Sequence, residues 1–207
     1  MNLLNKIFSW ILKNYIKVIL LILIIGLAYG IYLYFYFMAQ KKDQEAGDLF
    51  LNFYNSYSIS DFNEQDYTIV LDQISEIDNA SIYLVMLKSI YAVESVESND
   101  LQKALTELSN AREILSSKGN EFNFLKEIID LRMANIFIDL ADLERANNIL
   151  KNTFTTYQTN KLILQGDISA VEKKFDKAKK KYIEALERSE NQTQKNLINL
   201  KISTLTD

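Results

Sequence analysis

The sequence has 207 residues and contains no histidine, no cysteine and no proline, with only five glycines. Without histidine and cysteine the chain lacks the ligands of Cys/His zinc and iron–sulfur sites, the thiol nucleophile and the imidazole of acid–base catalysis. It can form no disulfide either. The absence of proline, which breaks helices, favours an all-α protein. We therefore expect no metal, no cofactor and no catalytic residue.

One long uncharged run stands near the N-terminus. Residues 18–39, VILLILIIGLAYGIYLYFYFMA, contain no charged side chain. As a helix they would measure about 33 Å, which is enough to cross the hydrocarbon core of a bilayer. A cleaved signal peptide is the competing interpretation, but the run is too long and no small-x-small cleavage site precedes the bulky YLYFYF cluster. The sequence predicts a short N-terminal segment over 1–17, a transmembrane helix over 18–39 and a helical extension over 40–57. The extension has apolar residues spaced on one face, so we expect it to dock onto the first helical hairpin of the remaining chain. These residues are Ala46, Leu49, Phe50, Phe53, Tyr54 and Tyr57.

The charges on the two sides of this run predict its direction. Lys6, Lys13 and Lys17, with the terminal amine, precede the run, and no acidic residue does. Lys41 and Lys42 follow it together with several acids. By the positive-inside rule the N-terminal segment faces the cytoplasm. We expect a single-pass protein of the cell inner membrane whose remaining residues lie in the periplasm of a Gram-negative cell.

Two glycines within the run, Gly26 and Gly30, form a G-x-x-x-G pattern. Such a pattern lets the backbone of a second membrane helix approach closely. The alternative is that both glycines simply face lipid. Pairing of this helix with another is therefore a hypothesis attached to Gly26 and Gly30.

The charge of the remaining chain argues against nucleic acid as a partner. Of 23 basic residues five lie at or before Lys42, which leaves 18 against all 27 acids, a net charge of −9. Nucleic-acid-binding surfaces carry the opposite sign. The lysines over 173–181 alternate with or adjoin acids at helical pairing distances, which is typical of a solvated helix face. These acids are Glu172, Asp176, Glu184 and Glu187.

Small residues recur at a fixed spacing in the second half of the chain. In each case a small residue is followed twelve positions later by an alanine, and the pairs are Ala92 with Ala104, Ala134 with Ala146, and Gly166 with Ala178. Large apolar residues flank each second alanine, three positions before it and four after it: Leu101, Leu143, Phe175, Leu108, Leu150 and Tyr182. Two antiparallel helices approach closely only where small residues meet. The pattern predicts three helical hairpins.

The relative positions of the small and large residues within each unit resemble those of the tetratricopeptide repeat. Asp100 and Asp142 precede the second helix of a unit and are expected to cap it, and Gly119 is expected to end a helix in a longer connection. Helices over 66–77 and near the C-terminus would complete the stack. The predicted fold is therefore all-α: one N-terminal transmembrane helix, then a tetratricopeptide-like stack of antiparallel hairpins over 58–207.

The order of these segments resembles the YfgM family, the ancillary subunit of the SecYEG translocon. The most specific local matches are ILQGD, with Leu164, Gly166 and Asp167, and the closing NLKISTL over 199–205, in which Leu200 stands where that family usually has methionine. The resemblance implies association with the SecYEG translocon and a PpiD-type periplasmic chaperone, and contact with exported unfolded chains. The alternative is an anchored scaffold for another envelope process, such as cell division or outer-membrane assembly.

The repeat phase also predicts which residues face a binding groove. They lie on the first helix of each unit: Met86, Val93, Val96, Ile128, Leu131, Asn135, Ile138, Ile163, Asp167 and Val171. Because this set is mostly apolar, and Leu131 stands where a carboxylate clamp needs a cation, an apolar segment or helix is the expected ligand. The alternative is that the protein's own residues 193–205 fill the groove.

An enzyme is the third class of function. Asp139 and Asp142 could act as a carboxylate pair on a glycan, a reaction that needs two acids at a defined separation. Each acid also has an ordinary structural or surface role, so we expect an interaction protein and no enzyme.

Overall fold

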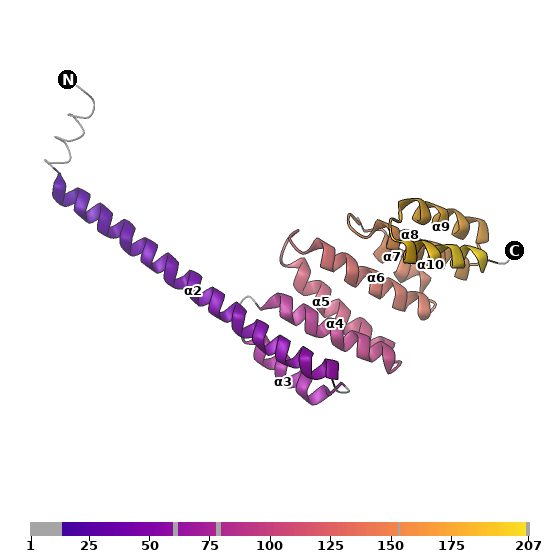
Figure 1. The fold of residues 1–207 in the computed structure, drawn as a ribbon, viewed down its shortest axis with the longest axis horizontal. Helices are drawn as coiled ribbons and strands as arrows, with labels where there is room; N and C mark the ends of the chain where they lie inside the picture. The colour runs from indigo at the N-terminus through magenta and orange to yellow at the C-terminus, as the bar shows by residue number, and fades with distance from the viewer. Residues whose placement is uncertain (1–13, 60–61, 78–79, 153, 206–207) are drawn as a thin grey trace, which may run out of the picture.

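The computed structural model of the chain describes residues 14–59, 62–77, 80–152 and 154–205. Within these ranges there are helices and no strands, which confirms the all-α prediction. The helices, in chain order, are α2 (Tyr15–Ile59), α3 (Glu64–Ser75), α4 (Ser81–Glu97), α5 (Leu101–Ser116), α6 (Asn123–Asp139), α7 (Leu143–Leu150), α8 (Gln158–Val171), α9 (Phe175–Arg188) and α10 (Gln192–Ser203). From α4 onward they stack as a row of hairpins, while α2 projects far from the stack (Figure 1).

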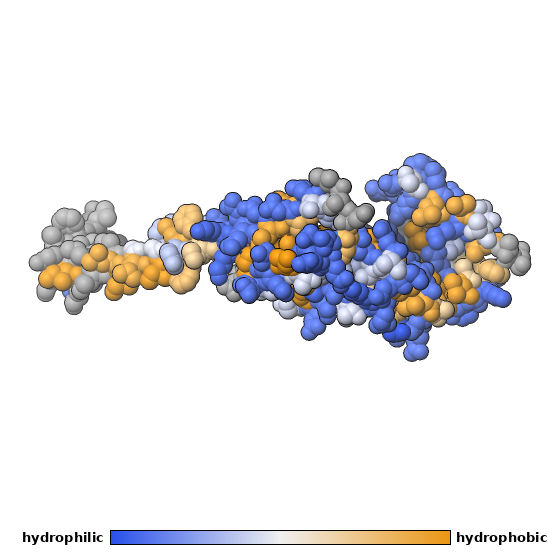
Figure 2. Space-filling view, turned by 90° about the horizontal axis from the view of Figure 1, so that it is seen from below, coloured by the Kyte–Doolittle hydropathy of each residue, from blue (hydrophilic) through white to orange (hydrophobic). Residues whose placement is uncertain are grey.

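Helix α2 is one continuous helix of 45 residues. Its first part is apolar all round, and the large apolar side chains from Leu23 to Met38 are exposed, except that Leu33 is half-buried. Figure 2 shows this part as a largely apolar rod that leaves a mainly hydrophilic body. The helix is long and apolar enough to cross a membrane. Lys6 and Lys13, on which the predicted direction depends, lie outside the described residues.

The second part of α2 packs against the stack. Ala46, Phe50 and Phe53 recur on one face and are buried. They form a cluster with α3 and α4 whose other buried members are Tyr67, Ile74, Ala80, Leu87 and Tyr91. The Tyr67 and Tyr91 rings stack with their centroids 4.3 Å apart. The docking of α2 that its spacing predicted is confirmed, and the contact is largely aromatic.

The three predicted hairpins are present as α4–α5, α6–α7 and α8–α9. The small residues that predicted them are buried where the two helices cross: Ala92, Ala104, Ala134, Ala146, Gly166 and Ala178. Gly166 shows the need for a small residue most clearly. A Cβ atom added to it would lie 2.3 Å from Cε1 of the buried Tyr182 ring. The ring therefore occupies the volume that any side chain at position 166 would need.

The turn inside each hairpin has the same backbone conformation. Asn99, Ala141 and Lys173 occupy equivalent positions and have φ values of 63°, 57° and 58°. In each turn the amide of the following residue donates to a carbonyl five residues back, as in Asp142 to Phe137 at 2.8 Å. This is the Schellman helix ending, which glycine usually forms. Here three other residues adopt the left-handed conformation, at some energetic cost.

The caps that follow these turns confirm one prediction. The carboxylates of Asp100 and Asp142 accept hydrogen bonds from the amides of Lys103 and Arg145, both at 3.0 Å. The third unit has Lys174 at this position and no side-chain cap. Between the first two hairpins Gly119 has a φ of +73°, as expected for the end of a helix.

Helix α10 closes the end of the stack against α9. Ile198 is fully buried with Ile163, Ala178, Tyr182 and Ala185. Leu197 and Leu200 of the same helix are about half exposed, at 47% and 59%. They lie on the face of α10 that turns away from α9, since they do not share the spacing of Ile198 and Ile202.

Candidate interaction cleft

A cleft of about 510 Å³ opens on the side of the stack formed by the first helices of the hairpins. We call it the inner cleft. Its lining residues come from α4, α5, α6, α8 and α10: Ala92, Val93, Val96, Glu97, Leu108, Leu131, Arg132, Asn135, Ile136, Asp139, Asn160, Ile163, Leu164, Gln194 and Leu197. The walls are mainly apolar. The inner cleft is thus a hollow of the size that receives apolar side chains of a ligand.

A smaller cleft of about 300 Å³ continues this surface toward the N-terminal helix. We call it the α2 cleft, because Phe50, Tyr54 and Tyr57 of α2 form one wall, opposite residues of α4 and α6. Val93 and Arg132 line both clefts, so the two hollows adjoin. The spacing of these α2 residues in the sequence predicted a role in packing alone. Tyr54 remains 46% exposed, which shows that this face of α2 is only partly covered by the stack.

The residues predicted to line a groove divide between these hollows. Those that line the inner cleft are Val93, Val96, Leu131, Asn135 and Ile163. Met86 and Ile128 line the α2 cleft, together with Val93.

Three predicted groove residues, Ile138, Asp167 and Val171, line neither cleft. Ile138 packs against the core of the stack. The Asp167 carboxylate accepts hydrogen bonds from the Tyr182 hydroxyl at 2.6 Å and from Lys201 Nζ at 2.7 Å, so it joins three helices. Val171 is exposed at the end of α8.

Helix α10 takes part in the inner cleft without filling it. Gln194 and Leu197 stand in its wall. Ile198, one residue further on, faces α8 and α9 instead. In the described part of the chain the alternative that residues 193–205 fill the groove does not hold, because α10 packs beside the cleft and leaves it open.

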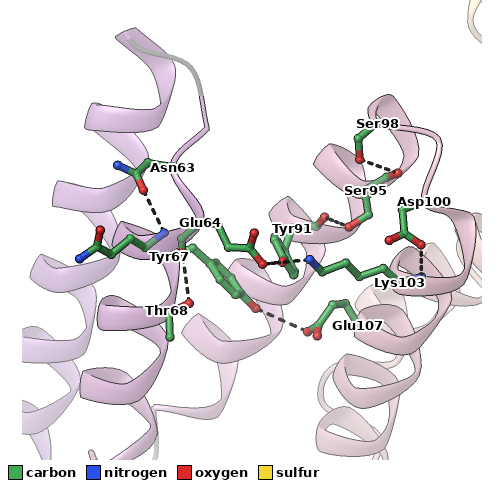
Figure 3. Close-up of polar contacts among 11 residues, drawn as sticks. Asn63, Glu64, Tyr67, Thr68, Tyr91, Ser95, Ser98, Asp100, Lys103 and Glu107 are labelled. Carbon is green, nitrogen blue, oxygen red and sulfur yellow. Dashed lines mark hydrogen bonds and ion pairs between the residues drawn. The ribbon is translucent and has the colours of Figure 1, made fainter.

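A polar network ties α3 to the first hairpin, and the sequence analysis missed it (Figure 3). The Glu64 carboxylate accepts hydrogen bonds from the Tyr91 hydroxyl and from Lys103 Nζ, the latter at 2.9 Å. The hydrogen bond from Tyr91, followed by that from Lys103, lowers the pKa of Glu64. Lys103 Nζ also lies 4.6 Å from the centre of the Tyr91 ring. These contacts fix the orientation of the α2–α3 layer on the hairpins.

A second acid on the same face acts in the same way. Glu107 accepts hydrogen bonds from Lys88 Nζ at 3.0 Å and from the Tyr67 hydroxyl at 3.5 Å. Burial, and then the charge of Glu107, raise the pKa of Tyr67. The partners are 19 and 40 residues apart in the chain, so no local pattern could reveal them.

Glu127 on α6 is buried and holds the start of α8. Its carboxylate accepts hydrogen bonds from the backbone amides of Thr155, Thr156 and Tyr157, at 2.7, 2.9 and 3.0 Å. Burial alone would raise the pKa of Glu127, but the hydrogen bonds from these amides hold it below its ordinary value. Asp130, also buried, pairs with Arg112 and accepts from Asn152 at 3.1 Å. Glu127 thus positions the start of the third hairpin against the second, whereas Asp130 joins α6 to α5 of the first hairpin and to the end of α7.

The two acids considered for glycan chemistry are placed differently. Asp142 is the cap of α7 and also pairs with Arg145. Hydrogen bonds from the amide and side chain of Arg145 lower the pKa of Asp142, as expected of a structural carboxylate. Asp139 is exposed and lines the inner cleft.

The glycines of the predicted membrane span are open to their surroundings. A Cβ atom added to Gly26 or to Gly30 would meet no atom within 4 Å. Neither glycine is needed for packing inside the described chain. Pairing with another membrane helix through this face stays a prediction.

Comparison with known proteins gives one match. The family model described as "Tetratricopeptide repeat-like domain" matches residues 9–207. No curated protein and no solved structure matches the chain. The matched range includes α2 and the three hairpins.

Proposed function

Because the chain belongs to the tetratricopeptide repeat-like family, we propose that it is a membrane-anchored, non-catalytic interaction protein that receives an apolar segment of a partner protein in its inner cleft. Domains of this kind generally act as scaffolds for other proteins. Fold alone does not choose the partner, so the proposal depends on the site.

The observation that carries the proposal is the open apolar cleft on the first helices of the hairpins. Val93 and Val96 lie there about 36% and 40% exposed, next to the half-exposed Leu197. Apolar side chains that adjoin in one hollow are typical of interaction sites, whereas single exposed apolar residues are not. A partner segment would cover these side chains and gain the free energy of removing them from water.

The anchor rests on the exposed apolar part of α2. Large side chains on every side of this helix, from Leu23 to Met38, face outward. In water such a surface is unfavourable, but lipid chains would cover it. We propose a single pass through the inner membrane, with the N-terminus in the cytoplasm and the stack in the periplasm.

For the partners, we propose the SecYEG translocon and a PpiD-type periplasmic chaperone, with exported unfolded chains as further ligands. This finer assignment rests on the resemblance of ILQGD and NLKISTL to the YfgM family. The runner-up is an anchored scaffold for another envelope complex, in cell division or outer-membrane assembly.

Site-specific photocrosslinking in native membranes tests the proposal. A photoreactive residue at Val93 or at Val96 of the full chain should capture a protein partner. The same residue at Ile183, which is about 41% exposed on α9, is the matched control outside the cleft. Translocon or chaperone components captured at Val96 and not at Ile183 support the leading assignment.

The other outcomes separate the alternatives. Captured envelope proteins without any Sec component would favour the runner-up scaffold. Capture of nothing at Val93 and Val96, in a sample in which the protein is intact, would overturn the inner cleft as the site of interaction.

A double substitution, Val93→Lys with Val96→Lys, tests whether the same surface is needed for recovery of the partner. It should reduce partner recovery and leave the helical content unchanged, because both side chains face the cleft. Ile183→Lys should leave recovery unchanged. Ile138 is unsuitable for this test because it packs against the core.

A further inference from the structure

The charged residues that line the inner cleft are Glu97, Arg132 and Asp139. Glu97 and Asp139 are exposed, and neither side-chain carboxylate makes a hydrogen bond or an ion pair with another residue of the described chain. The remaining polar lining residues, Asn135, Asn160 and Gln194, are uncharged amides. The two acids thus give this cleft its excess charge.

Both acids stand at the same end of the cleft. Glu97 is the last residue of α4, and Asp139 is the last residue of α6. These two helices run parallel, because each is the first helix of a hairpin (Figure 1). Their C-terminal ends therefore lie on the same side of the stack, where the helix dipoles add partial negative charge.

This placement is unfavourable for the helices themselves. A helix C-terminus is stabilised by a basic residue and destabilised by an acid. Neither α4 nor α6 has a basic residue in its last turn. Arg132 does not neutralise this end, because it precedes Asp139 by seven residues, which is about 10 Å along the helix axis. A cation of a ligand would relieve the repulsion.

Building on the proposed function, we propose that the inner cleft selects apolar partner segments that carry a lysine or arginine at one end. The apolar part lies along Val93, Val96 and Leu131, and the basic side chain binds between Glu97 and Asp139. Arg132, two turns away, repels a second cation at the opposite end. The two ends of the cleft thus carry opposite charges, so the cleft would bind the segment in one orientation.

The experiment uses the full chain in nanodiscs of zwitterionic phosphatidylcholine and two labelled peptides. Both are leucine- and alanine-rich helices of the same sequence, and one ends in lysine where the other ends in glutamate. Fluorescence anisotropy, corrected with empty nanodiscs, measures each affinity. We expect the lysine peptide to bind about fivefold more tightly, the size of effect typical of two exposed charge pairs. Added salt should reduce the difference.

Two variants assign the preference to these acids. Glu97→Gln with Asp139→Asn should make the two affinities equal, and Glu97→Lys with Asp139→Lys should reverse the preference. Glu113→Gln with Glu187→Gln removes two exposed acids near the ends of α5 and α9, away from the cleft, and should retain the preference for lysine.

Three outcomes would overturn the inference. Equal binding of both peptides to the unmodified chain would reject the charge preference and leave the cleft as a binding site. Binding of neither peptide would reject both the preference and the proposed role of the cleft. A photocrosslink from Val96 that joins two copies of the chain would identify a second copy as the occupant and reject a basic partner segment.

Discussion

The two parts of α2 contain the same types of apolar residue but lie in different surroundings. The first part projects from the molecule, and the second part packs against the helical stack. From Leu23 to Met38 the large apolar side chains point to every side of the helix and, except for Leu33, are exposed. From Ala46 to Phe53 the buried residues keep to one face, and the exposed positions are Asp48, Leu51 and Asn52. The difference shows that the angular distribution of apolar residues, more than their number, determines which surroundings a helix requires.

The largest expected effect comes from placing charge in the exposed apolar part. Ile24→Lys with Leu27→Lys should release the full chain from the membrane, because each lysine near the centre of a span costs about 3 kcal/mol. Carbonate extraction of membranes measures retention. Leu51→Lys, at an exposed position in the second part of α2, should leave retention unchanged. Retention of the double variant would remove the basis for a single membrane anchor.

The second effect concerns the docked part of the same helix. Phe50→Ala should lower the free energy of unfolding of the stack by about 3–5 kcal/mol, because it leaves a cavity among buried rings. Chemical unfolding of the full chain in mild detergent, followed by circular dichroism, measures the change. Leu51→Ala, one residue further along and about half exposed, should change it by less than about 0.5 kcal/mol. Equal effects would mean that α2 does not dock through this face.

The next prediction compares a glycine of the stack, Gly166, with a glycine of the first part of α2, Gly26. Gly166→Ala should destabilise the stack by about 1–3 kcal/mol, because the new methyl group would overlap the Tyr182 ring and force it to move. Gly26→Ala meets no neighbouring atom and should not destabilise the protein. The same unfolding measurement distinguishes them. A stable Gly166→Ala variant would mean that the third hairpin does not require its close crossing.

The turns between paired helices have no counterpart in the continuous α2. Ala141→Gly should stabilise the stack by about 1 kcal/mol, because glycine adopts the left-handed conformation of this turn without steric cost. Ala146→Gly, five residues later at a buried crossing, should instead destabilise it by about 1 kcal/mol or more. Unfolding midpoints of the two variants should therefore shift in opposite directions.

The smallest expected effect is the loss, at alkaline pH, of the stability that the Tyr57–Glu94 hydrogen bond contributes to the docking of α2. The Tyr57 hydroxyl donates to Glu94 Oε1 at 2.6 Å, and this hydrogen bond, followed by burial, raises the pKa of Tyr57 from 10.0 to about 12. Because the raised pKa belongs to the folded state, the contribution is complete below pH 10 and is lost as the pH rises toward 12. Tyr57→Phe should cost less than about 1 kcal/mol below pH 10, with the difference vanishing above pH 12. Tyr54→Phe is the control, and an unchanged difference at pH 12 would exclude this mechanism.

The parts of the fold that the sequence predicts well are those with a local signal. The hairpins follow from small residues twelve positions apart, and the caps follow from Asp100 and Asp142 directly before a helix. The docking face of α2 follows from the spacing of Ala46, Phe50 and Phe53. In each case the residues that carry the signal lie within two turns of helix or one short connection.

What the sequence does not reveal depends on distant partners. Glu64 finds Tyr91 and Lys103 only after three helices have packed, and Glu127 meets Thr155–Tyr157 across 28 to 30 residues. Ile138 and Asp167 stand at positions that the repeat spacing assigns to the groove, but neither lines a cleft. Ile138 packs against the core, and Asp167 accepts hydrogen bonds from Tyr182 and Lys201. The packing of α10 beside the inner cleft depends on Ile198, which the sequence does not distinguish from Leu197.

The continuity of α2 has a mechanical consequence. Met38, the last large exposed side chain of the first part, and Ala46, the first buried residue of α2, are eight positions apart, which is about 12 Å of helix. A flexible linker would let the stack adopt many orientations relative to the membrane, whereas in the proposed anchored state this continuous helix would fix the height and tilt of the stack above the bilayer. Partners embedded in the same membrane would then meet the binding surface after diffusion in two dimensions, already in a restricted orientation, which raises their effective concentration without any additional contact.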